Sequence, residues 1–212
     1  MLYGSNFPLK HFTTTKADGD MKDENKRLRF LISRKINPKT LVLAKQVHGN
    51  IIKIVSKADG GSCIDNCDGF ITDDKSVHLG IFTADCQPIL MTNQTLSVKA
   101  AIHSGWKGLA SGIIENAIEI FDKKFNIKPQ DICAYIAPHI QSCCYEVGAE
   151  FEKIFQTPLK DGKLNLSQIT KSKMEKLGIE SIEISPYCTM HNTELFFSYR
   201  RDKTDKRMLT IV

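Results

Sequence analysis

The chain has 212 residues, of which 42% are hydrophobic and 25% charged, and its formal net charge is +5. This length is sufficient for one domain that buries its own apolar core, so disulfides are not needed to replace packing. Basic and acidic residues are interleaved, and RNA-binding signatures, zinc-finger spacings and aromatic-basic stripes are missing. The composition therefore argues against sequence-directed nucleic-acid binding.

The seven cysteines are irregularly spaced. An odd number of cysteines in a chain of this size favours reduced thiols and a cytoplasmic protein. Residues 1–8 lack the basic region and long apolar core of a signal peptide. Since no apolar run is long enough to cross a bilayer, we expect no membrane partner.

The first elements follow from short apolar runs and turn residues. A short strand precedes a polar loop at 13–20, which we expect to be exposed. Asp23 is the expected N-cap of a helix with Leu28, Leu31 and Ile32 on its apolar face. Two β-rich runs within 41–55 flank His-Gly-Asn at 48–50, and this pattern predicts a hairpin with His48 at a strand end. A loop is expected at 57–67.

The middle of the chain predicts closely spaced strands at 68–72, 78–83, 88–92 and 97–103. Cys86 and His103 fall at or just past the ends of adjacent apolar runs, where loops place reactive side chains on a rigid scaffold. After Gly108 the apolar period changes to four residues, which predicts one amphipathic helix containing Leu109, Ile113, Ala117, Phe121 and Phe125.

The last third predicts strands at 131–137, 179–184 and 208–212 and helices at 148–155 and 166–177. Ser167 is a candidate N-cap of the second helix and Gly178 its stop. An aromatic strand is expected just before Arg200. No repeat or linker divides the chain, so we expect a single α/β (α+β) domain over residues 1–212.

His48, Cys86 and His103 are candidate ligands of one metal ion. A catalytic zinc takes three nitrogen, sulfur or oxygen ligands and leaves one position open. The spacing of 38 and then 17 residues matches no compact zinc motif, so a core cysteine and two surface histidines remain the alternative. Gly49 and Gly105 stand beside the histidines and permit close backbone approach.

Asp85 precedes Cys86 and could accept a hydrogen bond from a metal-bound imidazole, or cap the following turn. Cys86 could instead be a nucleophile activated by a nearby histidine. In that case the same three side chains would act without a metal.

Other thiols are rival metal or redox candidates. Cys63 and Cys67 are spaced C-x₃-C, and Cys143 is adjacent to Cys144. Neither pair has a matched second pair for a zinc site, which favours incidental thiols.

Arg200 and Arg201 are candidate anion-binding residues. Guanidinium groups bind phosphate or carboxylate through two parallel hydrogen bonds. The alternative is a solvated basic tail, because Lys203, Lys206 and Arg207 alternate with acids. A Gly-x-Ser-x-Gly elbow, a phosphate loop and a Gly-x-Gly-x-x-Gly fingerprint are all missing.

Six segments together resemble the YfiH-like family, which is named both for a polyphenol oxidase (laccase) domain and for purine nucleoside phosphorylase activity. They are Gln-Val-His-Gly at 46–49, Asp-Gly-Phe-Ile-Thr at 68–72, Thr-Ala-Asp-Cys-Gln-Pro at 83–88, His-Ser-Gly-Trp-Lys-Gly at 103–108, Tyr-Glu-Val-Gly at 145–148 and Phe-Phe-Ser-Tyr-Arg-Arg-Asp at 196–202. They span nearly the whole chain in the family's order.

The resemblance implies a mixed β-sheet sandwich flanked by helices, distantly similar to the catalytic domain of cytotoxic necrotizing factor, and not a Rossmann sheet. It implies a metal site of His48, Cys86 and His103 that holds zinc, with copper as the alternative. It also implies phosphorolysis of adenosine, inosine and methylthioadenosine, with deamination of adenosine. We expect Gln46, Arg200 and Arg201 to bind substrate or phosphate, and Asp85 to assist catalysis.

Two positions depart from the family pattern. Thr15 and Lys16 stand where members carry an arginine, and Lys107 stands where arginine is usual in the tryptophan motif. A lysine is a point charge that does not replace a bidentate fork. Three other functions stay open, namely a copper-dependent phenol oxidase, a metal-free cysteine hydrolase or amidase, and a non-enzymatic protein with structural zinc.

Overall fold

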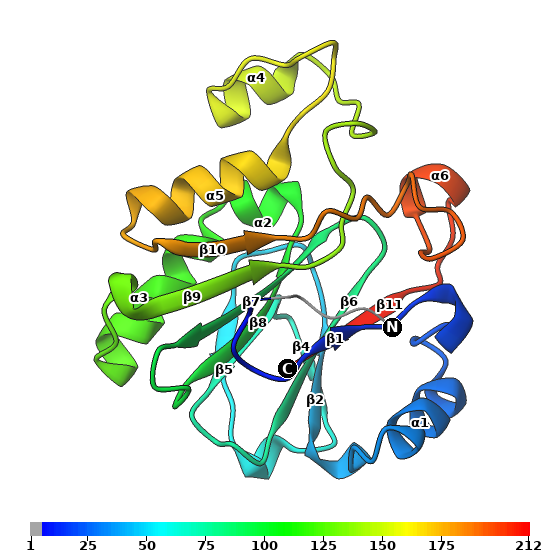
Figure 1. Ribbon diagram of the computed structural model, residues 1–212, viewed down its shortest axis with the longest axis vertical. Coiled ribbons are helices and arrows are strands. Elements are labelled where there is room, and N and C mark those ends of the chain that lie inside the picture. The colour runs from blue at the N-terminus through cyan, green and yellow to red at the C-terminus, as the bar shows by residue number, and fades with distance from the viewer. Residues whose placement is uncertain (1–5) are drawn as a thin grey trace.

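The protein is a sandwich of two mixed β-sheets with helices on both outer faces, as a computed structural model that describes residues 6–212 shows (Figure 1). Residues 1–5 lie outside the described residues, so most of the segment that was predicted not to be a signal peptide is not described. No helix in the described range is long and apolar enough to span a membrane. The predicted α+β sandwich is confirmed.

The first sheet has five strands and carries the N- and C-terminal strands of the chain side by side. Its order is β1 (Phe12–Thr13), β11 (Met208–Ile211), β6 (His78–Thr83), β2 (Leu41–Lys45) and β4 (Cys63–Asp65). The second sheet has six strands, in the order β10 (Ser181–Ile184), β9 (Ile132–Ile136), β7 (Gln87–Asn93), β8 (Lys99–Ser104), β5 (Gly69–Thr72) and β3 (Ile52–Ile54).

The helices are distributed unequally over the two outer faces (Figure 1). The six-stranded sheet is covered by α2 (Trp106–Ala110), α3 (Ile113–Phe125) and α5 (Leu166–Lys176), whereas α1 (Glu24–Ser33) packs against the five-stranded sheet. The remaining two helices are α4 (Glu150–Phe155) and α6 (Tyr199–Asp202).

Three apolar layers hold the sandwich together, one of which lies between α1 and the five-stranded sheet. Between the sheets, Val42 and Leu79 of one sheet pack with Phe70 and Leu90 of the other. Outside the six-stranded sheet, the buried face of α3, including Phe121, packs on the strands. Burial of each such large side chain stabilises the fold by roughly 1.5–3 kcal/mol. The layers are therefore held as a rigid scaffold for the strand ends.

Several predicted elements were wrong, and tertiary packing explains each correction. The expected hairpin at 48–50 does not form, because β2 pairs with β4 and β6 in one sheet while β3 pairs with β5 in the other. The segment that contains His48 therefore crosses between the sheets. The expected loop at 57–67 contains the strand β4, and Thr13, Thr14 and Thr15 in the expected exposed loop are buried.

Helix boundaries and faces also differ in detail. Asp23 caps α1 as predicted, but Phe30 and Leu31 are the buried residues of that helix, while Leu28 and Ile32 are exposed. The helix expected after Gly108 is divided into α2 and α3 at Gly112, whose φ is 90°. Asn165, not Ser167, caps α5. The segment before Arg200 is not a strand and leads into α6.

Three neighbouring strands of the six-stranded sheet, β5, β7 and β8, bring Asp68, Cys86 and His103 to the same end of the sheet. Strands β7 and β8 are antiparallel partners with Pro88 opposite His103, so Cys86, just before β7, lies next to the end of β8. Strand β5 pairs with β8 on its other side and begins just after Asp68. The pairing of β7 with β8 thus brings Cys86 and His103 to the same end of this sheet.

Candidate metal centre and cavity

His48, Cys86 and His103 lie together. One potential ligand atom from each side chain lies within 4.8 Å of the others. The rings of His48 and His103 are perpendicular, with centroids 4.7 Å apart. His103 is buried, Cys86 is half-buried and His48 is exposed, so the cluster opens to solvent on the His48 side. These side chains come from three separate segments, and the tertiary structure forms the cluster.

Asp68 fixes the orientation of His103. Its Oδ1 lies 2.8 Å from Nδ1 of His103, and both side chains are almost fully buried. This contact leaves Nε2 of His103 as the nitrogen available to a metal, an arrangement common around metal-bound histidines. Asp85 was one candidate acceptor for an imidazole, and the carboxylate that contacts His103 is that of Asp68.

The same carboxylate also shapes the segment that carries His48. It accepts hydrogen bonds from the backbone N–H groups of Val47, His48 and Gly49 at 3.3, 2.9 and 2.8 Å. His48 has a φ of 61°, in the left-handed region that non-glycine residues seldom adopt. The three hydrogen bonds stabilise this conformation, because successive N–H groups converge on one anion. Asp68 therefore links two of the three candidate ligands.

Two glycines permit the close approach of these segments. A Cβ atom on Gly105 would lie 3.2 Å from Sγ of Cys86 and 3.3 Å from Cδ2 of His48. A Cβ atom on Gly108 would lie 2.6 Å from the carbonyl oxygen of Gly49. The first glycine leaves room for the ligand cluster, and the second allows α2 to pack against the His48 segment.

The protonation of the cluster favours a thiolate. Burial opposes ionisation of Cys86, but the charge of His103 and hydrogen bonds from both histidines lower the pKa of the thiol to about 6. For His103, burial disfavours the charged ring, yet Cys86 and Asp68 raise its pKa to about 9. Burial also opposes ionisation of Asp68, and hydrogen bonds from His103 and the Gly49 amide lower its pKa. Both shifts favour a thiolate on Cys86 beside an imidazolium on His103 when no metal is bound.

Asp85 has a different task from the one expected. Its carboxylate accepts hydrogen bonds from the Thr189 hydroxyl at 2.6 Å, the Ser198 hydroxyl at 3.0 Å and the Arg200 backbone N–H at 2.6 Å. Its φ is 97°, and these contacts hold the strained residue in place. Asp85 directly precedes Cys86, and its carboxylate thus holds the C-terminal segment that carries Arg200 close to Cys86.

A cavity of about 880 Å³ opens over the cluster. His48, Cys86 and His103 line one part of it, and several aromatic side chains line other parts. Its basic lining residues are Lys22, Arg27, Lys45, Arg200 and Arg207, whereas Asp85 is the acidic residue in the described part of the lining. The cavity therefore favours an anionic or polar ligand with a flat apolar portion.

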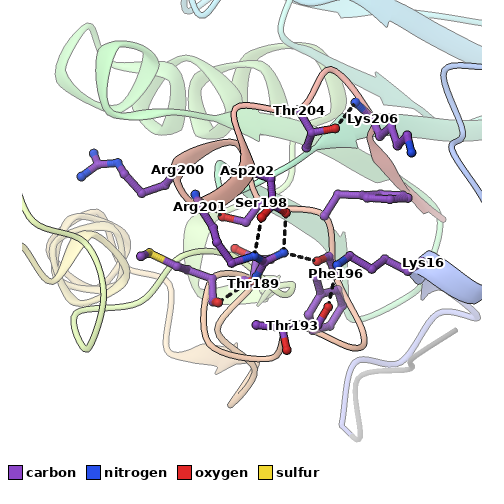
Figure 2. Close-up of polar contacts among 12 residues, drawn as sticks. Lys16, Thr189, Thr193, Phe196, Ser198, Arg200, Arg201, Asp202, Thr204 and Lys206 are labelled. Atoms are coloured by element: carbon purple, nitrogen blue, oxygen red, sulfur yellow. Dashed lines mark hydrogen bonds and ion pairs between the residues drawn. The ribbon is translucent and has the colours of Figure 1, made fainter.

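The two predicted arginines point in different directions (Figure 2). Arg200 lines the cavity, lies over the ring of Tyr145 with its guanidinium carbon 5.1 Å from the centroid, and donates to the carbonyl oxygen of Glu146. Arg201 donates instead to the carbonyl oxygens of Thr189, Met190 and Phe196 and to the carboxylate of Asp202. Arg201 therefore holds the C-terminal loops together and does not line the cavity.

Gln46 lines the cavity, but its amide contacts the neighbouring strand. Nε2 donates to the carbonyl oxygen of Phe82 at 2.8 Å, and Oε1 accepts from the Phe82 N–H at 2.9 Å. These contacts extend the pairing of β2 with β6 beyond Lys45. The side chain therefore fixes the cavity wall.

The positions that depart from the family pattern lie away from the cavity lining. Thr15 is buried and its hydroxyl donates to Asp18 at 2.9 Å, while Lys16 donates to the carbonyl oxygen of Thr193 at 2.7 Å (Figure 2). Lys107 is exposed, with its ammonium 5.6 Å from the centroid of the Trp106 ring.

The six thiols other than Cys86 differ in burial and in their neighbours, and Cys133 lies half-buried in β9. Cys63 is exposed and lines the cavity, whereas Cys67 is buried and donates to the carbonyl oxygen of Ile64. Burial raises the pKa of Cys67 to about 11. Cys143 and Cys144 lie with Cys188 in a second group of three thiols, and all seven cysteines are free. No motif in the sequence indicated that Cys188 joins the adjacent pair.

Sequence reasoning missed Asp68 and the basic lining residues Lys22, Arg27, Lys45 and Arg207. Asp68 had one available signal, which is a carboxylate at the entry to the buried run at 69–72. The four basic residues had none, because they come from separate segments that only the tertiary structure brings to one cavity.

The donor set fits a single zinc ion. Two imidazoles and a thiolate are borderline-soft ligands that zinc accepts, and the cavity leaves a fourth position for water or substrate. Copper electron-transfer sites also use two histidines and a cysteine, usually with a weak axial methionine. The residues present therefore fit one metal ion of the zinc or copper class.

Comparison with known proteins identifies the class to which this fold and site belong. The family model described as multi-copper polyphenol oxidoreductase laccase matches residues 5–212. A purine nucleoside phosphorylase of Aquifex aeolicus is 37% identical over 193 residues, covering 89% of this chain and 88% of that protein. Another from Clostridium acetobutylicum is 34% identical over 186 residues, covering 83% and 78%.

Solved structures agree with these sequence matches. The crystal structure of YlmD from Geobacillus stearothermophilus superposes with a TM-score of 0.83 at 30% identity, covering 88% of this chain and 78% of that chain. The crystal structure of a hypothetical protein YfiH from Bacillus licheniformis has the same TM-score at 29% identity, covering 88% and 79%. The chain belongs to the laccase-domain family that includes the YfiH proteins, and the predicted resemblance is confirmed.

Proposed function

We propose that this protein is a zinc-dependent purine nucleoside enzyme, which splits adenosine, inosine or methylthioadenosine with phosphate and also deaminates adenosine. The main observation behind this proposal is that one cavity is lined both by the His48–Cys86–His103 cluster and by several basic side chains, including Arg200. The relatives named purine nucleoside phosphorylase support this choice of substrate.

The cavity has the size and lining for a nucleoside and phosphate together. Its volume of about 880 Å³ is within the range of small-molecule sites. Trp106, Phe82 and Tyr199 supply aromatic surface on which a purine base can stack, while the ring of Tyr145 is covered by Arg200. One cavity therefore offers both aromatic surface and basic side chains.

Arg200 is the residue we assign to phosphate. Its backbone is held by Asp85 and its guanidinium by Tyr145 and Glu146, so little conformational freedom is lost when an anion binds. In phosphorolysis a phosphate oxygen forms a bond to the anomeric carbon while the bond to the purine nitrogen breaks. Positioning of phosphate by Arg200, in a cavity that Lys45 and Arg207 also line, stabilises the charges that separate.

The metal ion would supply Lewis-acid polarisation and an activated water for deamination. His48, Cys86 and His103 would hold it, and Asp68 would keep His103 in the tautomer that presents Nε2. Asp85 contributes by positioning Arg200 relative to Cys86. We place the protein in the cytoplasm, since its seven thiols are free, and we expect neither nucleic-acid nor membrane partners.

One observation favours a second candidate function. The pKa of Cys86 near 6 provides a thiolate without a metal, as a cysteine hydrolase or amidase requires. A copper-dependent phenol oxidase agrees with the description of the family model, and a structural zinc without catalysis agrees with the donor set.

Product analysis distinguishes these functions. Metal-free protein is loaded with zinc or copper and incubated with adenosine and phosphate, and chromatography then measures adenine, ribose 1-phosphate and inosine. The zinc-loaded protein is expected to form all three products. Cys86→Ser and His103→Ala should each lower turnover by at least about 100-fold, since each removes a direct ligand. Cys133→Ser is the matched control and should keep full turnover, because Cys133 belongs neither to the His48–Cys86–His103 cluster nor to the group of Cys143, Cys144 and Cys188.

The alternatives give opposite results. Turnover of an ester or amide that survives chelation and stops on alkylation would establish the cysteine hydrolase instead. Oxygen consumption with a phenol by the copper form alone would establish the oxidase. Loss of thermal stability without metal, with no turnover in any assay, would leave structural zinc.

A further inference from the structure

A second cluster of soft ligands lies outside the cavity. The sulfur atoms of Cys143, Cys144 and Cys188 all lie within 4.8 Å of one another. Cys143 is exposed, Cys144 half-buried and Cys188 buried, so the cluster can be reached from solvent on one side. None of the three lines the cavity over His48, Cys86 and His103.

The cluster joins two segments that are distant in sequence. Cys143 and Cys144 occupy a turn between β9 and α4, while Cys188 follows β10. In the turn, the backbone N–H of Cys144 donates to the carbonyl oxygen of Gln141 at 2.9 Å. The Gln141 N–H donates to Sγ of Cys188 at 3.4 Å, and its side-chain amide donates to the carbonyl oxygen of Ser185 at 2.8 Å. These contacts hold the turn that carries Cys143 and Cys144 against the segment that carries Cys188.

The geometry points to a second metal site, in which these three thiolates bind a thiophilic ion of the Cu(I) or Zn²⁺ class. Thiolate sulfurs bind such ions at about 2.3 Å, which places sulfurs around one ion about 3.8–4.0 Å apart. The sulfurs of Cys143 and Cys144 are already 3.4 Å apart. Movements of less than about 1 Å therefore bring all three sulfurs to one ion.

Three thiolates favour soft ions over hard ones. Thiolate ligands select Cu(I) and Zn²⁺ over Mg²⁺ and Ca²⁺, which prefer oxygen. Trigonal coordination by three sulfurs satisfies Cu(I), whereas Zn²⁺ would complete its tetrahedron with a water on the exposed side of Cys143. A disulfide would use only two of the three sulfurs, so the cluster as a whole matches a metal ion better than a single crosslink.

An ion in this cluster would stabilise two segments whose next residues contact side chains that line the cavity. Tyr145 follows Cys144 and carries the ring on which Arg200 lies. Thr189 follows Cys188 and donates its hydroxyl to Asp85. Binding at the three thiolates ties both segments together and stabilises the folded protein by mass action.

The test uses full-length, reduced, metal-free protein. Cd²⁺ is added as a spectroscopic probe and thiolate-to-metal charge transfer is recorded in the ultraviolet. Cu(I) and Zn²⁺ are titrated separately against chromophoric chelators. The variant Cys86→Ser isolates the second cluster, because it removes the thiolate of the first. Cys143→Ser and Cys188→Ser are made in that background, with Cys133→Ser as the matched control.

We expect Cys86→Ser to retain one equivalent of thiolate-bound metal, with a raised unfolding temperature in its presence. Adding Cys143→Ser or Cys188→Ser should lower the affinity more than about 100-fold, since each removes one of three ligands. Adding Cys133→Ser should change neither quantity. Cys143 is exposed, so its variant tests the site even where substitution of the buried Cys188 prevents folding.

The inference is overturned if Cys86→Ser binds none of the three ions with a thiolate signature. It is equally overturned if the retained binding is unaffected by Cys143→Ser. A disulfide among these cysteines in protein that takes up no metal after reduction would also overturn it. Because binding is measured without substrate, these results are independent of the catalytic proposal.

Discussion

Oδ1 of Asp68 accepts a hydrogen bond from Nδ1 of His103 at 2.8 Å and another from the backbone N–H of His48 at 2.9 Å. One buried carboxylate therefore sets the ring of one candidate ligand and the backbone of a second. The geometry of the cluster depends on a residue that does not belong to it, and the first prediction follows from this dependence.

Asp68→Asn should weaken metal binding by about 10–100-fold, because a ligand histidine loses its charged acceptor. The folded state should lose about 1–3 kcal/mol, since a buried amide NH₂ would then face backbone donors. Chelator competition measures the affinity and urea unfolding measures the stability. Asp122→Asn is the control, because it removes only an exposed ion pair with Lys128 and should change stability by less than about 1 kcal/mol. Unchanged metal affinity in Asp68→Asn would contradict the proposed role of Asp68.

Alkylation of Cys86 in metal-free protein should show an unusually low midpoint in pH. The thiol has a pKa lowered from 9.0 to about 6, so the reactive thiolate predominates above pH 6 and is lost as the pH falls through that value. The pKa of His103 is raised to about 9, so the ion pair exists between about pH 6 and about pH 9. Iodoacetamide labelling followed by mass spectrometry at a series of pH values gives the midpoint. In His103→Gln the midpoint should move up toward the ordinary thiol value; a midpoint that stays near 6 would exclude His103 as the cause.

Gly105→Ala should lower metal affinity through steric contact alone. The backbone of Gly105 has a φ of −78°, which alanine adopts freely, but the added methyl group would approach Cys86 and His48 at 3.2 and 3.3 Å. Those two side chains must then separate by a few tenths of an ångström, and we expect about a tenfold loss of affinity. Gly105→Ser is the matched variant, because it adds the same Cβ together with a hydroxyl able to cap α2. Equal loss of affinity in both variants would support the steric cause, and full affinity in Gly105→Ser would refute it.

Arg200→Ala and Arg201→Ala should have different effects although the residues are adjacent. Arg200→Ala removes a cavity side chain, so the phosphate concentration for half-maximal turnover should rise at least about tenfold with little change in stability. Arg201→Ala leaves three backbone carbonyl oxygens without their donor and should cost about 2–4 kcal/mol of unfolding free energy. Phosphate saturation kinetics and thermal unfolding separate the two effects. If Arg201→Ala alone raised the phosphate requirement in folded protein, the assignment of Arg200 would be wrong.

Much of the fold was predictable because its signals are local. The strands at 78–83 and 88–92, the cap at Asp23 and the stop at Gly178 each follow from apolar runs or capping residues read over a few positions. The break between α2 and α3 and the buried face of α1 were not predictable, because they depend on what each helix packs against.

The His48–Cys86–His103 cluster shows the same division. The residue types, the apolar runs that end at Cys86 and His103, and the family resemblance were sufficient to name the three candidate ligands. The sequence by itself could not place His48 correctly, because a hairpin and a crossing between sheets have the same local pattern of turn residues. Only the tertiary structure selected Asp68 over Asp85, separated Arg200 from Arg201 and brought Cys188 to Cys143 and Cys144. These contacts join residues far apart in the chain, and long-range packing, which no short window of sequence contains, decides which side chains meet.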